Sequence, residues 1–277
     1  MSRAGERSHH PNMQQTTIRG TKLAWEDSGK GLPVVLLHPF PLSRSVWNEQ
    51  RLKLSKHFRI LTPDFRGFGD SALDAPAITM EDLADDVRVL LDELKLYRVI
   101  LGGLSMGGYV SFAFYRKYPS RVRGLILANT RPQADDEQGK QAREELASLA
   151  EQKGSGAVGT HMIPRLFGEA TFRLNPHVPI ATWRKIDAAR PESIAAASRG
   201  MAQRKDATSI LPQINCPVLL IAGEQDTLIP LSIAEQMEKA IPDARLELLP
   251  EAGHLSNLEK PVEFTEIVED FLDEFPV

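Results

Sequence analysis

Short apolar runs alternate with amphipathic helical stretches along most of the chain. The runs that predict strands are residues 34–37, 60–61, 99–101, 125–127, 218–221 and 246–249. Runs that are apolar on both faces are typical of a mostly parallel sheet covered by helices on both sides. Apolar positions recur at helical spacing over residues 80–96, and residues 106–118 predict a helix directly after a strand. We therefore expect a doubly wound α/β fold with a mostly parallel sheet.

The strand-helix alternation stops at Thr130 and resumes near Cys216. The interval between them holds helical patterns at residues 136–152, 156–167 and 191–202. Glycine- and proline-containing turns separate these patterns, so we expect a helical cap inserted into the core. The expected segments are a disordered start at 1–15, a first core part at 16–130, the cap at 131–212 and a second core part at 213–277.

Composition and charge narrow the class of protein. The chain has 277 residues, 42% of them hydrophobic and 25% charged, which excludes a disordered, collagen-like or disulfide-rich protein. Lys and Arg number 33 against 37 for Asp and Glu, and a net charge of -4 offers no broad positive field. We expect a small-molecule partner and no nucleic acid, and leave open whether the protein is a monomer or a small homo-oligomer.

Targeting signals and cofactor motifs are the next features to consider. Residues 1–15 lack the apolar stretch of a secretory signal, and no run reaches the roughly 18 apolar residues of a membrane span, so we expect a soluble, cytoplasmic protein without a membrane partner. The single cysteine, Cys216, precedes an apolar run and indicates a buried structural thiol. No metal-ligand spacing, phosphate loop or dinucleotide fingerprint occurs, so we expect chemistry without a metal or cofactor.

The sharpest local motif is Gly103-Leu104-Ser105-Met106-Gly107, placed between a predicted strand and a predicted helix. Small residues on both sides of a serine are needed where a strand reverses tightly into a helix, because a side chain there would clash with neighbouring backbone. Such a turn exposes the serine hydroxyl at the edge of the sheet. Ser105 is therefore the candidate nucleophile.

A serine nucleophile requires a base within hydrogen-bonding reach and an acid that orients the base. Of the seven histidines, His254 is the best base, because it follows the last predicted strand and its loop crosses the same sheet edge as Ser105. Asp226 follows the strand at 218–221 and is favoured over Glu224, which lies closer to the strand end. We expect His38 and the turn-rich segment 64–71 to order the loops behind the site.

A tetrahedral intermediate needs two preorganised N–H donors. The amide of Met106, which follows the nucleophile, supplies one of them. In His38-Pro39-Phe40-Pro41-Leu42 the prolines have no N–H, so Phe40 and Leu42 remain, and Phe40 is favoured. The apolar side chains that we expect to line the substrate pocket are those of Phe40, Leu42, Ile163, Leu166, Phe167 and Ile229.

Taken in chain order, these motifs resemble the α/β-hydrolase superfamily over residues 21–275, from the HPFPL loop through DFRGFGDS and GLSMG to GEQD and AGHL. The string 102–110 is similar to small bacterial carboxylesterases, and the GLSMGG elbow also to 3-oxoadipate enol-lactonases and cofactor-free haloperoxidases or perhydrolases. The resemblance implies that Ser105, Asp226 and His254 form a triad. Relatives commonly have His-Gly where this chain has His38-Pro39, and the dehalogenases and epoxide hydrolases of this fold use an aspartate nucleophile.

The residues and the resemblance together predict a serine carboxylesterase that acts on small carboxylic esters through an acyl-enzyme intermediate. The alternative is a lactonase or perhydrolase with the same triad. A lactonase of this kind takes a charged cyclic substrate, for which Arg165 or Arg173 would supply a basic side chain over the pocket. A non-catalytic α/β-hydrolase that only binds its ligand is a more distant alternative.

Overall fold

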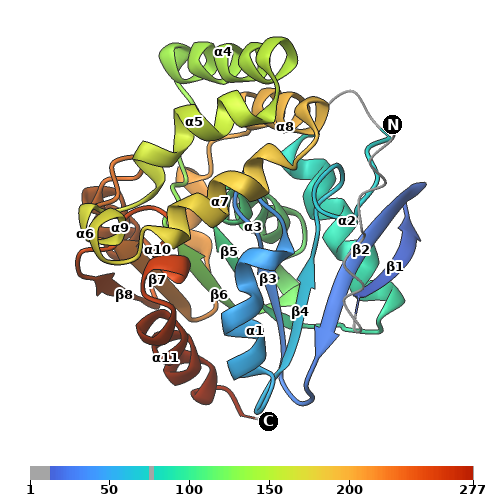
Figure 1. The fold of residues 1–277 in the computed structure, drawn as a ribbon. Helices are drawn as coiled ribbons and strands as arrows, with labels where there is room; N and C mark the ends of the chain where they lie inside the picture. Colours follow the sequence, from blue (N-terminus) through green and yellow to red (C-terminus); the bar gives the residue numbers. More distant parts are fainter. Residues whose placement is uncertain (1–12, 75–77, 277) are drawn as a thin grey trace.

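The computed structural model describes residues 13–74 and 78–276 and contains an eight-stranded sheet with the order β1-β2-β4-β3-β5-β6-β7-β8 (Figure 1). β1 (Met13–Ile18) pairs antiparallel with β2 (Thr21–Ser28), which pairs antiparallel with β4 (Arg59–Pro63). In the order of the sheet, every pair of neighbouring strands from β4 to β8 is parallel. The doubly wound α/β fold is thus confirmed. The expected disorder is wrong for residues 13–15, which pair with β2, while residues 1–12 lie outside the described part.

The parallel part of the sheet, which ends at the edge strand β8, carries most of the apolar runs that the sequence marks as strands. These strands are β3 (Pro33–Leu37), β5 (Val99–Leu104), β6 (Val122–Ala128), β7 (Val218–Gly223) and β8 (Ala244–Leu249). Every residue of β5 and β7 is buried, as expected for strands that are covered on both faces. Cys216, just before β7, is buried as well, and burial raises the pKa of its thiol to about 12.

Helices cover both faces of this sheet (Figure 1). α1 packs against α11 on one face, and α2 packs against α3 on the other. Their bounds, with the remaining core helices, are α1 (Asn48–Leu54), α2 (Met80–Glu93), α3 (Met106–Lys117), α9 (Leu231–Ala240), α10 (Ser256–Glu259) and α11 (Pro261–Asp273). Short 3₁₀ helices occur at Arg44–Trp47, Pro119–Arg121 and Thr208–Gln213. In the described residues no helix is long and apolar enough to cross a membrane.

Five α-helices lie between β6 and β7 in the described chain and gather at one end of the sheet (Figure 1). They are α4 (Glu137–Lys153), α5 (Ser155–Leu166), α6 (Glu169–Leu174), α7 (His177–Asp187) and α8 (Pro191–Ala202), together called the helical segment below. The predicted helical patterns correspond to α4, α5 and α8, whereas α6 and α7 were not predicted. A cap at 131–212 as a separate unit stays a prediction.

Candidate active site

Ser105 lies in a tight turn between β5 and α3, with backbone angles φ 53° and ψ -111°. A positive φ is costly for a residue with a side chain and persists only where the surroundings hold it. A Cβ added at Gly103 would lie 2.2 Å from the carbonyl carbon of Gly107, and one added at Gly107 would lie 2.2 Å from the carbonyl oxygen of Leu37. Glycine is therefore required on both sides of this serine, as the sequence motif indicates.

The structure brings Ser105, His254 and Asp226 together into one hydrogen-bonded chain. His254 Nε2 lies 2.8 Å from Ser105 Oγ, and His254 Nδ1 lies 2.8 Å from Asp226 Oδ2. His254 and Asp226 are 3% and 6% exposed, so little solvent competes for these bonds. Glu224, the rival acid, instead accepts a hydrogen bond from the backbone N–H of Glu251.

The surroundings of Asp226 keep its carboxyl group ionised. Burial by itself would raise its pKa, but the adjacent His254 ring and hydrogen bonds to the carboxylate outweigh burial and lower the pKa below its ordinary value. The backbone N–H groups of Leu228 and Ile229 donate to Oδ1, and the Asn129 amide donates to Oδ2 at 2.9 Å. Asp226 is therefore held both in position and in its charged form.

Two polar residues that sequence reasoning missed hold the loops of the site together. Asn129, directly after β6, also donates to the carbonyl of Gly253 and accepts from Ser256 Oγ. The carboxylate of Glu259 accepts from the backbone N–H groups of Gly253 and Gly168, both at 2.8 Å. The position of Asn129 at a strand end was a usable signal, whereas nothing in the sequence near Glu259 marks its contacts.

The two amides predicted to face an oxyanion have no competing partner in the described residues. Leu42 donates its N–H to the carbonyl of Pro39 at 3.0 Å, which leaves Phe40 as the free donor of this loop. Within residues 13–74 and 78–276, no acceptor is recorded for the N–H of Phe40 or of Met106. Phe40 also lines the cavity that contains Ser105.

A cavity of about 270 Å³ opens onto Ser105 and His254. Ile229 lines it as predicted, together with Leu228, Tyr109 and Met201. The helical segment contributes polar and basic side chains as well as apolar ones. From this segment and the residues that precede it come Arg131, Asp135, Gly139, Ala142, Arg143, Leu146, His161, Met162 and Arg165.

Four of the predicted lining residues lie elsewhere. α5 turns His161, Met162 and Arg165 toward the cavity, because these positions share one face of the helix. Among the residues that the structure describes, Leu42, Ile163, Leu166 and Phe167 do not line it. Leu166 is buried instead against the loop of His254, where its carbonyl accepts from the N–H groups of His254 and Leu255. Arg173 does not line it either.

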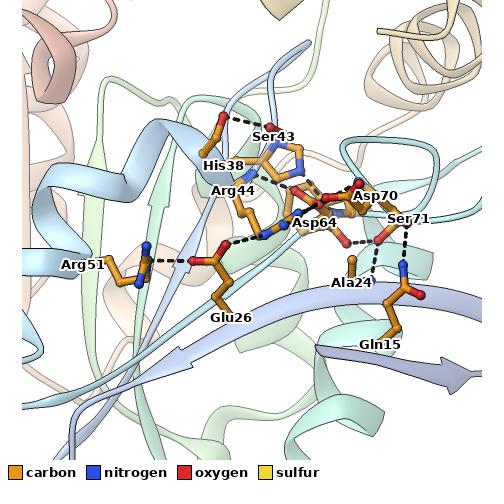
Figure 2. A network of polar contacts seen from close by, with 12 residues as sticks. Gln15, Ala24, Glu26, His38, Ser43, Arg44, Arg51, Asp64, Asp70 and Ser71 are labelled. Carbon is orange, nitrogen blue, oxygen red and sulfur yellow. Dashed lines mark hydrogen bonds and ion pairs between the residues drawn. The ribbon is translucent and has the colours of Figure 1, made fainter. Parts of the chain in front are cut away.

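A largely buried ionic network surrounds Arg44, which follows the Phe40 loop in the chain (Figure 2). The Arg44 guanidinium pairs with Asp64, Glu26 and Asp70. Burial raises the pKa of Asp64 to about 6, an effect that Arg44 partly offsets. Arg44 and Asp64 are both buried and paired with each other. The network therefore holds the chain in place at Arg44, directly after the Phe40 loop.

His38 lies next to this network, and in the described residues it has no recorded hydrogen bond to Ser105, Asp226 or His254. Its Nε2 accepts from the backbone N–H of Phe65 at 3.1 Å, and its Nδ1 lies 3.0 Å from the carbonyl of Pro39. Burial lowers the pKa of the ring to about 4, so it is neutral near pH 7. A neutral ring with Nδ1 protonated satisfies both contacts. In the described part of the chain, no group of three or more His, Cys, Asp or Glu side chains is arranged to hold a metal ion.

The fold and this site define a class of protein, and comparison with known proteins gives the same class. The family described as alpha/beta hydrolase fold matches residues 33–261, so the chain belongs to that family. An esterase structure from Thermogutta terrifontis with malate bound has 42% identity and a TM-score of 0.92, over 95% of this chain and 98% of that one.

Two lactonases are also similar to the chain. The enol-lactonase structure from Burkholderia xenovorans LB400 has 30% identity and a TM-score of 0.87, over 94% of this chain and all of that one (100%). The 3-oxoadipate enol-lactonase 2 of Acinetobacter baylyi is 28% identical over 83% of this chain and 85% of its own length. The chain is thus an α/β hydrolase that resembles both esterases and enol-lactonases.

Proposed function

We propose that this hydrolase is a serine carboxylesterase that cleaves small carboxylic esters through an acyl-enzyme intermediate. The observation that carries the proposal is the chain of hydrogen bonds from Ser105 Oγ through His254 to Asp226, with 2.8 Å at each link. A serine hydroxyl is a weak nucleophile near neutral pH unless a positioned base takes its proton. Ser105 is then the nucleophile, His254 the base and Asp226 the acid that orients it.

In the first half of the reaction, Ser105 Oγ attacks the ester carbonyl carbon while His254 Nε2 takes the serine proton. The N–H groups of Phe40 and Met106 stabilise the negative oxygen that develops. The bond to the alcohol oxygen then breaks, and His254 gives its proton to the departing alcohol. In the second half, His254 activates a water molecule that attacks the acyl carbon, which releases the carboxylic acid and restores Ser105. Throughout, the ionised Asp226 accepts a hydrogen bond from Nδ1–H of His254, which holds the ring in the orientation the reaction needs.

The helical segment acts in this proposal as a cap over the site. The residues that support this role are His161, Met162 and Arg165 of α5, which line the cavity with Ser105. A cavity of about 270 Å³ is at the small end for ligand sites, which suits a short ester better than a long-chain lipid.

Hydrolysis of a cyclic ester, as in an enol-lactonase, is the second candidate. Arg165 lines the cavity, which favours a charged substrate of the kind expected for such a reaction. The same triad would open a lactone, with the alcohol product remaining joined to the acyl group until water releases it. No observation of this kind favours a perhydrolase reaction or a binding protein without catalysis.

The test compares wild type, Ser105→Ala and the control Ser232→Ala on p-nitrophenyl esters from acetate to decanoate. Ser232 is an exposed serine of α9 that does not line the cavity in the described residues. We expect Ser105→Ala to lose at least about a thousandfold in kcat, because the triad acts as a unit, and Ser232→Ala to match wild type. The chain-length optimum should be short. Full activity in Ser105→Ala would refute the proposal.

A pH profile of the same reaction tests the base. Activity should rise as the His254 ring loses its proton, because only the neutral ring can accept a proton from Ser105. Asp226 stays ionised over this range, since its pKa lies below the ordinary value. Activity that fell steadily from about pH 5 to 8 would contradict the role of His254.

A further inference from the structure

The side of the cavity formed by the helical segment carries an excess of positive charge. Arg131, Arg143 and Arg165 line the cavity together with Ser105. Asp135 is the sole carboxylate among the lining residues that the structure describes. The excess is local, because the chain as a whole has a net charge of -4.

Asp135 does not neutralise the arginines around it. Its carboxylate is buried and pairs with Arg131, Arg143 and Arg204, so one negative charge meets three positive ones. Although burial by itself would raise the pKa of Asp135, these guanidinium groups lower it well below its ordinary value. The carboxylate is therefore fully charged near neutral pH, and two positive charges still remain in excess.

Arg204 is the arginine of this cluster whose positive charge balances the negative charge of Asp135. It is 5% exposed, and its guanidinium donates to Asp135 and to the carbonyls of Met201 and Gln133. The same group lies 4.2 Å from the centroid of the Tyr109 ring. Arg204 is thus occupied by protein groups, and it balances the charge of Asp135. The charges of Arg131 and Arg143 are the ones left without a balance.

The donors of Arg143 are available to a ligand. Only its Nε is bonded, to Asp135 Oδ2 at 3.1 Å, and no partner is recorded for Nη1 or Nη2 within residues 13–74 and 78–276. The buried Nε of Arg131 has no recorded partner in the same residues, and neither has the Arg165 guanidinium. A planar fork of free N–H donors in a cavity matches the geometry of a carboxylate.

From this cluster we propose that the ester substrate carries a carboxylate, which Arg143 binds with Arg131 while Ser105 attacks the ester carbonyl. The proposal rests on the function proposed above and adds the substrate class: monoesters of dicarboxylic acids, or esters of hydroxy acids. Arg165 lies at the same cavity and adds to the attraction. An anion bound here restores the charge balance that Asp135 alone does not provide.

The experiment uses ester pairs that differ only in one charge. Monomethyl glutarate and methyl 4-carbamoylbutanoate carry a carboxylate or an amide on the acyl side, and 3-acetoxypropanoate and 3-acetoxypropanamide carry them on the alcohol side. Proton release at constant pH gives kcat/KM for each ester. We expect a preference of about tenfold or more for the carboxylate in at least one pair, and a smaller preference at high salt. Equal rates within both pairs would overturn the proposal.

Variants then assign the preference to Arg143. Arg143→Gln should lower the carboxylate-to-amide ratio by about tenfold, and Arg143→Lys should lower it less, because it keeps the charge but loses the fork. The matched control is Arg199→Gln, an arginine of α8 that pairs with Glu144 and Glu151. It should keep the wild-type ratio. An unchanged ratio in Arg143→Gln would exclude Arg143 from recognition.

Calorimetry with glutarate and glutaramide separates this proposal from the proposed function. Tighter binding of glutarate without turnover of any ester, p-nitrophenyl acetate included, would keep the anion site and refute the esterase. Turnover of p-nitrophenyl acetate with equal affinity for both compounds would keep the esterase and refute the anion site.

Discussion

Asn129 is one of the residues that hold the Asp226 carboxylate in place. It follows β6 with a positive φ of 45°, a conformation that asparagine adopts more readily than most residues. Its side chain bonds Asp226 Oδ2, the carbonyl of Gly253 and Ser256 Oγ. A single amide therefore connects the end of β6 to the acid and to the loop that carries His254.

Replacing Asn129 by glycine tests this connection without adding backbone strain, because glycine tolerates a positive φ. We expect kcat to fall by roughly ten- to thirtyfold, since a hydrogen bond to a charged group contributes about 2 kcal/mol. KM should stay near the wild-type value, because Asn129 does not line the cavity in the described structure. Steady-state kinetics on p-nitrophenyl acetate measures both constants.

The companion variant is Ser256→Ala, which removes only the hydrogen bond to Asn129 Oδ1. It should lower kcat less than Asn129→Gly does, because the bond from Asn129 to Asp226 remains. A wild-type kcat in Asn129→Gly would show that Asp226 is held well enough by the N–H groups of Leu228 and Ile229.

At the scale of elements, Glu259 at the end of α10 joins the loop of His254 to the helical segment. Its Oε1 accepts from Gly253 N–H, and its Oε2 accepts from Gly168 N–H and from Thr171 Oγ1 at 2.7 Å. The residue is 7% exposed, so water cannot readily replace these bonds. The carboxylate thus satisfies three donors from two different parts of the chain.

Glu259→Gln should destabilise the protein, because an amide offers one oxygen where two are needed. One backbone N–H would face an amide NH₂ group, and a buried donor left unsatisfied costs about 1–3 kcal/mol. Urea denaturation should therefore show a lower free energy of unfolding, with a parallel loss of kcat/KM. Glu251→Gln, an exposed change in the same loop, should be neutral. Wild-type stability in Glu259→Gln would mean that the loop does not depend on this carboxylate.

The strands that could be predicted from the sequence are those whose apolar composition indicates that they are buried. β3, β5, β6 and β7 are apolar on both faces. The site residues Ser105, Asp226 and His254 each follow a strand of the parallel part of the sheet. β1 and β2 were missed because polar residues dominate β1. The turn between them, Arg19-Gly20, has a positive φ at both residues, as a tight two-residue hairpin turn requires.

The inward face of α5 was beyond sequence reasoning for a different reason. The helix has apolar residues on more than one face, and it packs against both α4 and α7. Its rotation is therefore set by these contacts, not by its own pattern, and Met162 and Arg165 line the cavity where Ile163 and Phe167 were expected. Basic side chains reach this cavity through the packing of α5, and no sequence motif marks them in advance.

At the scale of the whole molecule, the sheet and the helical segment meet at a buried ionic junction. Arg131 lies just after β6, Arg143 belongs to α4, and Arg204 follows α8. All three pair with Asp135, whose side chain is fully buried at 0% exposed. The Asp135 carboxylate thus connects the segment after β6 to α4 and to the segment after α8. This junction lies next to the cavity of the site.

Asp135→Asn should lower the free energy of unfolding by about 3 kcal/mol at pH 7, because it leaves the buried guanidinium of Arg204 without its charged partner. The native pKa of Asp135 lies below the ordinary value of 3.8, so its stabilisation is complete well above pH 3.8 and is lost as the pH falls through that value toward the native pKa. The difference between wild type and Asp135→Asn should therefore be constant from about pH 8 to 5.5 and shrink by about pH 3.5. Urea titrations across this range measure it, with the exposed change Glu137→Gln as control. A difference that stays constant down to the lowest pH would show that the charge of Asp135 does not stabilise the junction.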